Sequence, residues 1–340
     1  MNRNFIQTSL TTLLNTPSPT GFSHLIMDEL EKIVTALGYT LTRTKKGNGI
    51  IEITGSDSKK TIGVAAHVDT LGAMVRSVKS NGNLAITALG GYTMHSIEGE
   101  YVTIHTRSGH VYTGTVLNTE PSVHVFEGAR TQERKIENME IRLDEVVKCK
   151  DDVFALGIET GDFIAFDPRA VWTDTGYIKS RHLDDKAGMA AILGLLEHLK
   201  SYELTPKYDL KIIISTYEEV GHGAAHLPFS FDEIIAVDMG AMGSDLTCTE
   251  HQVSICPKDS SGPYDYSLTN ALIATAKNNA IDFAIDVYPY YGSDVSAALR
   301  AGHDFKGALI GPGVHASHHM ERTHIEAIEA TANLLATYLV

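Results

Sequence analysis

The chain lacks the features typical of secreted and membrane-spanning proteins. It has only three cysteines in 340 residues and no Cys-x-x-Cys pair, which argues against a disulfide framework and against a thiolate zinc site. No apolar run approaches the ~20 residues needed to cross a bilayer. Residues 1–14 mix polar and apolar side chains, which predicts an amphipathic helix without the apolar core of a signal peptide. These absences favour a cytoplasmic protein that has no membrane partner.

Positive charge is also scarce. The chain has 28 lysines and arginines against 42 acidic residues, giving a formal net charge of -14 at pH 7. The basic residues do not form a stripe that could follow a phosphate backbone, so nucleic-acid binding is not expected. At 340 residues the chain exceeds the ~250 to 300 residues at which single cores stop growing, so we expect two domains.

Hydrophobic periodicity predicts an α/β domain interrupted by a β-rich segment. Residues 61–67 are almost continuously apolar, as in a strand buried on both faces. From 72 to about 166 the pattern changes to short alternating segments separated by turns, and long helical and apolar patterns return from 185 onward. The α/β segments are helices at 1–14, 23–37, 185–199, 266–278, 294–301 and from about 322, and strands at 50–54, 61–67, 210–216, 234–237, 283–287 and near 308.

The β-rich segment is best explained as an insertion into a loop of the larger domain, because lengthening a surface loop costs little free energy. We therefore expect a catalytic α/β domain made of residues 1–69 and 167–340. Residues 70–166 would form the small inserted domain, with strands near 73–78, 84–88, 101–106 and 111–116.

Histidine and carboxylate residues follow several of these strands or begin a helix. Side chains beyond the carboxyl ends of strands in an open α/β sheet converge on one crevice. Taken singly, each is more often a solvated strand end or a helix cap. Together they offer nitrogen and oxygen ligands to two divalent ions, as in a two-metal hydrolase. The groups are His67-Val-Asp69, Asp184-Asp185, Glu218-Glu219, Asp238 and the run 315–319.

Two of these groups have a further chemical meaning. The adjacent carboxylates Glu218 and Glu219 repel each other, and a nearby cation would relieve that repulsion. One of the pair can bind metal while the other accepts a proton from a metal-activated water. Asp184 is the candidate bridge, because a carboxylate can span ions ~3.5 to 4 Å apart. Asp185 can instead be the N-cap of the following helix.

Five ordered segments resemble the tetrahedral aminopeptidase family, which includes glutamyl and deblocking aminopeptidases and proteins labelled endoglucanases. The resemblance runs nearly end to end, and five motifs in order are far more specific than a lone His-x-Asp. The segments are His67-Val-Asp69, Lys179-Ser-Arg-His-Leu-Asp-Asp-Lys-Ala-Gly188, Thr216-Tyr-Glu-Glu-Val-Gly221, Ala236-Val-Asp-Met-Gly240 and Ser317-His-His-Met-Glu-Arg-Thr-His324.

The resemblance implies a phosphorylase/hydrolase-like three-layer α/β catalytic domain with an inserted barrel-like or PDZ-like β domain. It further implies a large hollow homo-oligomer, commonly a dodecamer, in which the inserted domain serves assembly and substrate access. The implied activity is a metal-dependent aminopeptidase that acts on peptides with a free N-terminus. Its two metal ions per subunit would be zinc or cobalt, or else manganese, since nitrogen and oxygen donors accept all three.

Transferred by position, the resemblance assigns one ion to His67, Asp184 and Asp238 and the second to Asp184, Glu219 and a C-terminal histidine. His318 is the choice for that histidine, because Ser317-His318 followed by Glu321 matches one branch's form of the motif. His315 is the reserve.

Three further roles concern acidic residues. Glu218 would be the general base, and Asp69 would orient His67 as a carboxylate behind the metal ligands. The segment 291–294 resembles a family loop near the substrate, so Asp294 is a candidate substrate-binding residue. Its alternative role is the N-cap of the helix over 295–301.

Two other functions remain to be weighed. An endoglucanase needs two carboxyl groups ~5 to 9.5 Å apart on either side of a glycosidic bond, which the sequence neighbours Glu218 and Glu219 do not easily provide. A non-catalytic scaffold would keep the fold without the chemistry, but such a protein has no reason to keep an unligated base at position 218.

Overall fold

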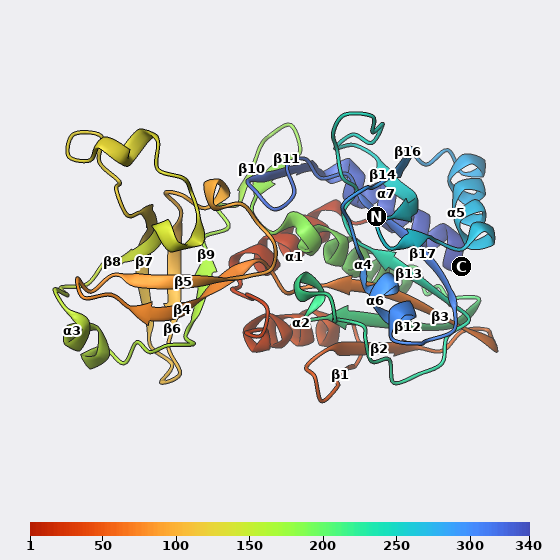
Figure 1. Ribbon diagram of the computed structural model, residues 1–340. Helices are drawn as coiled ribbons and strands as arrows, with labels where there is room; N and C mark the ends of the chain where they lie inside the picture. Colours follow the sequence, from red (N-terminus) through yellow and green to blue (C-terminus); the bar gives the residue numbers. More distant parts are fainter. The chain divides into compact units, whose positions relative to one another are not determined.

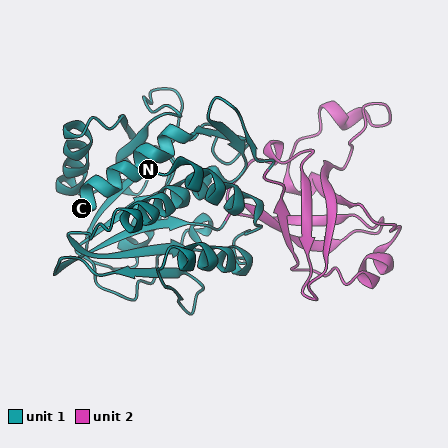
Figure 2. Ribbon diagram, turned by 180° about the vertical axis from the view of Figure 1, so that it is seen from behind, with its two compact units in different colours: residues 1–69, 169–340 teal, residues 70–168 magenta.

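The computed structural model describes residues 1–340 and separates into two compact units (Figure 2). The larger unit comprises Met1–Asp69 and Arg169–Val340, and the smaller unit comprises Thr70–Pro168. The expected segment 70–166 thus differs from the smaller unit by two residues at its C-terminal end. Each unit has a hydrophobic core of its own.

The larger unit is built on a nine-stranded mixed sheet (Figure 1), in the order β1-β2-β12-β3-β13-β17-β14-β15, with β16 paired to β14. Its central strands β12, β3, β13 and β17 are parallel to one another. The strands are β1 Leu41–Arg43, β2 Gly49–Ile53, β3 Asp57–His67, β12 Tyr208–Ser215, β13 Glu233–Val237, β14 Val253–Asp259, β15 Gly262–Pro263, β16 Phe283–Val287 and β17 Lys306–Pro312.

Alternating side chains of the central strands enter two different cores. On β12, for example, Leu210, Ile212 and Ile214 face one core, whereas Ile213 faces the other, as the two-residue period of a strand requires. Helices α2, α4, α5 and α7 pack into the first core and α6 into the second, which gives three layers. The helices are α1 Arg3–Asn15, α2 His24–Ala36, α4 Leu183–Ser201, α5 Tyr266–Asn278, α6 Asp294–Arg300 and α7 Ile325–Leu339.

The smaller unit is a closed barrel with the strand order β4-β5-β8-β7-β6-β9. Its first and last strands are neighbours, because β4 pairs with β9. Its elements are β4 Gly72–Val78, β5 Leu84–Leu89, η1 Met94–Ser96, β6 Tyr101–His105, β7 Val111–Asn118, η2 Glu127–Arg130, η3 Ile136–Asn138, β8 Met139–Leu143, α3 Lys150–Ala155 and β9 Phe163–Phe166.

The predicted fold class, an α/β domain with an inserted β-rich domain, is confirmed. One local prediction needs correction. The last helix begins at Ile325 rather than near 322, because β18 Glu321–His324 pairs with β11 Tyr177–Ser180, which also pairs with β10 Val171–Trp172. Several strands, among them β14, were not predicted. No helix combines the length and the apolar character that crossing a bilayer requires.

Candidate metal centre

The predicted site residues meet at the carboxyl ends of three parallel strands. His67 is the last residue of β3, and Asp238 directly follows β13. Glu218 and Glu219 begin the short 3₁₀ turn η4 Glu218–Val220, which comes shortly after β12. Because neighbouring parallel strands end at the same edge of the sheet, these side chains are brought together from distant parts of the sequence.

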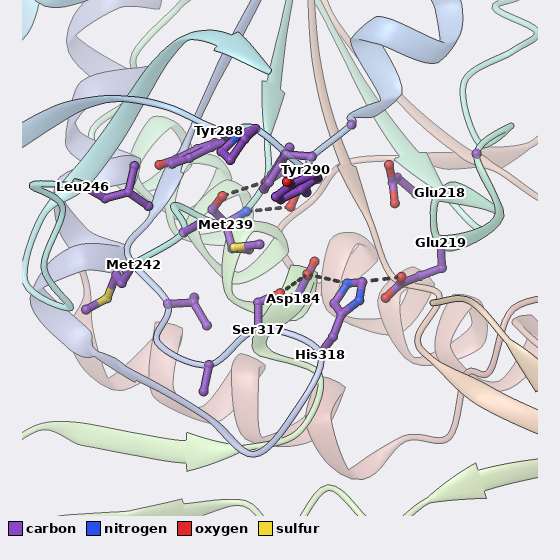
Figure 3. A pocket seen from close by; sticks show the side chains of 18 residues that line it. Asp184, Glu218, Glu219, Met239, Met242, Leu246, Tyr288, Tyr290, Ser317 and His318 are labelled. Atoms are coloured by element: carbon purple, nitrogen blue, oxygen red, sulfur yellow. Dashed lines mark hydrogen bonds and ion pairs between the residues drawn. The ribbon is translucent and has the colours of Figure 1, made fainter. Parts of the chain in front are cut away.

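Asp184 lies between His67 and His318, of which Figure 3 shows His318. Its Oδ1 atom is 3.2 Å from His67 Nε2, and its Oδ2 atom is 3.3 Å from His318 Nε2. The acidic pair completes the cluster, with Glu219 Oε2 3.6 Å from His318 Nε2 and Glu218 Oε2 3.8 Å from His67 Nε2. The two oxygens of one carboxylate thus face two different sets of ligands, which is the arrangement expected of a bridging residue.

At this site, two groups of three ligand atoms each lie close enough to hold an ion. The atoms of His67, Glu218 and Asp238 are all within 4.8 Å of one another, and so are those of His67, Asp184 and Glu219. The expected ligands His67, Asp184, Glu219 and Asp238 are therefore brought together. Glu218, the expected base, stands beside Asp238 in the first group.

Burial and like charges make this cluster unfavourable without a cation. Burial raises the pKa of Glu218 and Glu219 well above the usual range, and that of Asp238 to about 7, because desolvation disfavours the charged form. Like charges add to this effect at each residue. The cavity beside the cluster is lined by no lysine or arginine. Imidazole and carboxylate donors with an excess of negative charge fit divalent metal ions.

His67 and Asp184 are both stabilised in their charged forms, although burial opposes ionisation at each of them. Burial lowers the pKa of His67, but hydrogen bonds to Asp184 and Asp69 outweigh it and hold that pKa well above the usual value. Burial opposes ionisation of Asp184, yet hydrogen bonds to His318 and His67 hold its pKa below the usual range. Asp184 is thus the carboxylate of the cluster best stabilised in its charged form.

Asp69 makes further contacts besides the expected one with His67. The nearest acceptor to His67 Nδ1 is the main-chain oxygen of Asp69, at 2.9 Å, whereas the carboxylate lies 3.6 Å away. That carboxylate accepts hydrogen bonds from the backbone N–H groups of Glu218 and Glu219, at 3.1 and 3.3 Å. It also accepts one from the Thr20 hydroxyl, at 2.7 Å. The Asp69 side chain therefore holds the acidic turn in place.

The backbone of α4 is not helical at Asp184 and Asp185, and Asp185 caps the regular part of the helix that follows, as one of the two interpretations of the sequence expected. Its Oδ1 atom accepts a hydrogen bond from the backbone N–H of Gly188, at 3.1 Å. Its Oδ2 atom accepts another from the backbone N–H of His67, at 3.2 Å. The same carboxylate thus fixes both the helix start and the end of β3.

Glu321 is a site residue for which the sequence analysis assigned no role. It is buried, and its carboxylate accepts hydrogen bonds from the backbone N–H groups of Asp184, at 3.1 Å, and His318, at 3.0 Å. It therefore fixes two metal-ligand candidates relative to each other. The available signal was its place three residues after His318 in the C-terminal motif.

The structure distinguishes His318 from its alternative. His315 is exposed and pairs through its backbone with Arg322. Neither His315 nor His318 belongs to the two groups of ligand atoms described above, so the contacts of the side chains distinguish them. His318 is the histidine of the C-terminal run that faces Asp184.

Asp294 lies behind the site instead of in it. It does not line the cavity, and its Oδ1 atom accepts hydrogen bonds from Ala224 N, at 2.8 Å, and Ser215 Oγ, at 3.3 Å. Nor is it the N-cap of α6, because Ser293 occupies that position and accepts a hydrogen bond from Ser296 N. Its contacts support the segment that follows Glu219.

A cavity of about 610 Å³ opens beside the carboxylates (Figure 3). Asp184, Glu218, Glu219, Asp238 and His318 form its charged part. A substrate in this cavity would lie directly against the candidate metal ligands.

Comparison with known proteins places the chain in a family. Residues 47–334 match the model of the M42 glutamyl aminopeptidases. The chain belongs to this M42 family. It is 46% identical over 328 residues to the putative aminopeptidase YhfE of Bacillus subtilis. This match covers 96% of this chain and 95% of the relative.

Solved structures similar to this one show the same fold. A TET aminopeptidase from a marine-sediment Thaumarchaeota archaeon superimposes with a TM-score of 0.90 and 18% identity, covering 98% of this chain and 96% of the other. The TET1 peptidase of Pyrococcus horikoshii, described as assembling into a tetrahedron or a large octahedral shell, gives a TM-score of 0.86 and 21% identity, covering 98% of each chain.

Proposed function

We propose that this M42 protein is a dinuclear metallo-aminopeptidase that removes residues from the free N-terminus of peptides. The observation that supports this most is the position of Asp184, whose two carboxylate oxygens face His67 and His318 separately. The family match and the name of the 46% identical relative support the aminopeptidase activity.

In this proposal one ion would be held by His67, Asp184 and Asp238, and the second by Asp184, Glu219 and His318. Two such ions supply Lewis acidity, which polarises the scissile carbonyl group and makes water a better nucleophile near neutral pH.

Glu218 serves as the general base in this proposal. It accepts a proton from the attacking water and returns it to the nitrogen of the leaving peptide, so that the peptide bond breaks as one water is added. The Asp69 carboxylate keeps Glu218 in place through its backbone N–H. The cavity beside Glu218 receives the side chain of the first residue.

Exchange of Glu218 for Gln tests the base, because the amide keeps the size of the side chain but cannot accept the proton. We expect kcat for an aminoacyl-p-nitroanilide to fall by about 10²- to 10⁴-fold, while the metal content measured by mass spectrometry stays the same. Glu145→Gln, at an exposed position of the smaller unit, is the matched control. Near-normal activity of Glu218→Gln would reject the assigned role.

Chelation tests the metal requirement and the number of ions. We expect a chelator to abolish activity and zinc, cobalt or manganese to restore it, with two ions bound per chain. One ion per chain at full activity would contradict a dinuclear centre and leave the aminopeptidase assignment in place.

The two alternative functions predict different results. For an endoglucanase, the carboxyl groups must stand on opposite sides of a glycosidic bond, but Glu218 and Glu219 are adjacent on one 3₁₀ turn. Hydrolysis of a soluble glucan but not of aminoacyl anilides would favour the endoglucanase. A non-catalytic scaffold would bind metal and hydrolyse neither class of substrate.

We also infer that the chain assembles into a large homo-oligomer, with a tetrahedral dodecamer as the expected form. Val123, Val125 and Phe126 of the smaller unit are exposed by 55%, 74% and 39%, and apolar clusters of this kind are typical of contact surfaces. Light scattering should give about twelve times the 36.9 kDa mass of the chain. Val125→Asp should reduce this mass, whereas Val146→Asp, on another exposed loop, should not. A monomeric wild-type protein would refute this inference.

A further inference from the structure

Away from the metal ligands, the cavity wall is apolar. It is formed largely by aliphatic, thioether and aromatic side chains, among them Met239, Met242, Leu246, Tyr288, Tyr291 and Val314. In Figure 3, Met242 and Leu246 lie on one side of the cavity and Glu218 and Glu219 on the other. A substrate whose scissile bond lies at the carboxylates would therefore direct a neighbouring side chain toward this wall.

Two of the three tyrosines that line the cavity, Tyr288 and Tyr291, offer ring faces because their hydroxyl groups are already engaged, whereas Tyr290 is 96% exposed. The Tyr291 hydroxyl donates a hydrogen bond to the main-chain oxygen of Met239, at 2.7 Å, and the Tyr288 hydroxyl shares one with Ser254. The two ring centroids are 5.1 Å apart with an interplanar angle of 34°. A bound side chain thus meets aromatic carbon at these positions.

The wall also lacks charge. All charged residues that line the cavity, namely Asp184, Glu218, Glu219, Asp238 and His318, belong to the candidate metal centre. No lysine or arginine is present to pair with an acidic substrate side chain, and no carboxylate outside the metal centre is present to pair with a basic one. Burying an unpaired charge against such a wall is strongly unfavourable.

We propose that this wall is the specificity pocket for the first residue of the substrate and selects large apolar side chains such as Leu, Met and Phe over Glu and Lys. The proposal rests on the aminopeptidase function proposed above. It assigns this chain a preference for uncharged first residues, unlike the glutamyl specificity in the family's name.

The test is kcat/KM for Leu-, Met-, Phe-, Ala-, Glu- and Lys-p-nitroanilides with the metal-loaded protein. We expect Leu to exceed Ala by about 10- to 100-fold, as methylene groups in an apolar pocket allow, and to exceed Glu and Lys by at least about 100-fold, because of the unpaired charge. Preference for the Glu or Lys substrate would overturn the pocket assignment while leaving the aminopeptidase intact.

A charged residue introduced into the wall should change the order of the substrates by kcat/KM in a predictable direction. Met242 is half-buried, so a lysine there can extend its ammonium group toward water and the protein should still fold. We expect Met242→Lys to improve kcat/KM for the Glu substrate by about 10-fold and to reduce it for Leu. Ile285→Lys, at an exposed position of β16 outside the cavity, should leave the ranking unchanged. An unchanged ranking in Met242→Lys would contradict the proposal.

A binding measurement separates failure of the pocket from failure of the function. Calorimetry with the metal-loaded Glu218→Gln protein should show tighter binding of the dipeptide Leu-Gly than of Glu-Gly or Lys-Gly. If no anilide is hydrolysed but Leu-Gly still binds best, the proposed catalytic function fails and the pocket stands. Equal binding of the three dipeptides would refute the pocket.

Discussion

Asp69→Asn should destabilise the fold and misplace the acidic turn, although it changes only one atom. The carboxylate uses Oδ1 for the backbone N–H of Glu218 and Oδ2 for that of Glu219 and for the Thr20 hydroxyl. An asparagine has one acceptor oxygen and one NH₂ group. Whichever way its amide is turned, the NH₂ group faces a backbone N–H, so two donors oppose each other at a buried position.

The expected loss follows from these contacts. One hydrogen bond to a charged acceptor is worth about 1.5 to 3 kcal/mol, and a buried donor left unpaired costs about 1 to 3 kcal/mol. We therefore expect the free energy of unfolding to fall by about 2 to 5 kcal/mol. At roughly 2 to 4 °C per kcal/mol for a domain of this size, the melting temperature should fall by about 4 to 20 °C. A displacement of Glu218 by about 1 Å would reduce kcat by about 10²-fold.

Calorimetric melting in a chelator measures this effect without the stabilisation that bound metal adds. The matched control is Thr20→Val, which removes one donor and leaves the two backbone contacts of Asp69 intact, so it should cost only about 1 kcal/mol. An Asp69→Asn protein that melts within about 2 °C of the wild type, with normal kcat, would refute the role of this carboxylate.

Two further predictions concern reactivity and packing. In the native protein at pH 8, iodoacetamide should label the exposed Cys149 and not the other two cysteines. The thiolate is the nucleophile, and burial raises the pKa of both other thiols to about 12. When the protein is denatured before labelling, mass spectrometry should find all three cysteines labelled. Gly311→Ala should prevent folding, as judged by soluble yield and circular dichroism, because its Cβ would lie 1.2 Å from the main-chain oxygen of Asp238. Gly91→Ala, whose Cβ would meet no atom within 4 Å, should fold normally. Labelling of all three native cysteines, or a stable Gly311→Ala protein, would contradict these packing arguments.

Elements with a strong local signal were predicted well from the sequence. The apolar runs at 62–66 and 210–214 became the buried central strands β3 and β12, because a strand covered on both faces has no polar alternation. Four of the expected metal ligands, His67, Asp184, Glu219 and Asp238, also lie in two neighbouring groups that share His67. Their positions near strand ends or at a helix start limited where their side chains could go.

Other features depend on contacts between distant segments and have no local signal. The Asp69 carboxylate contacts a turn about 150 residues away in sequence, and Glu321 contacts a backbone N–H 137 residues away. The start of α7 was misplaced, because Glu321–His324 gains strand geometry only by pairing with β11. Such pairings are set by tertiary structure, which overrides local preference.

Because β4 pairs with β9, the barrel is a cassette, that is, an inserted domain whose two ends lie next to each other. The chain enters the barrel on β4 and leaves it on the neighbouring strand β9. If the barrel were deleted, a short linker could therefore join the two flanking segments of the larger unit. Evolution could therefore lengthen, exchange or delete this cassette while inheriting the catalytic machinery intact. The natural junction for a graft is residue 70, directly after Asp69, which must itself be retained.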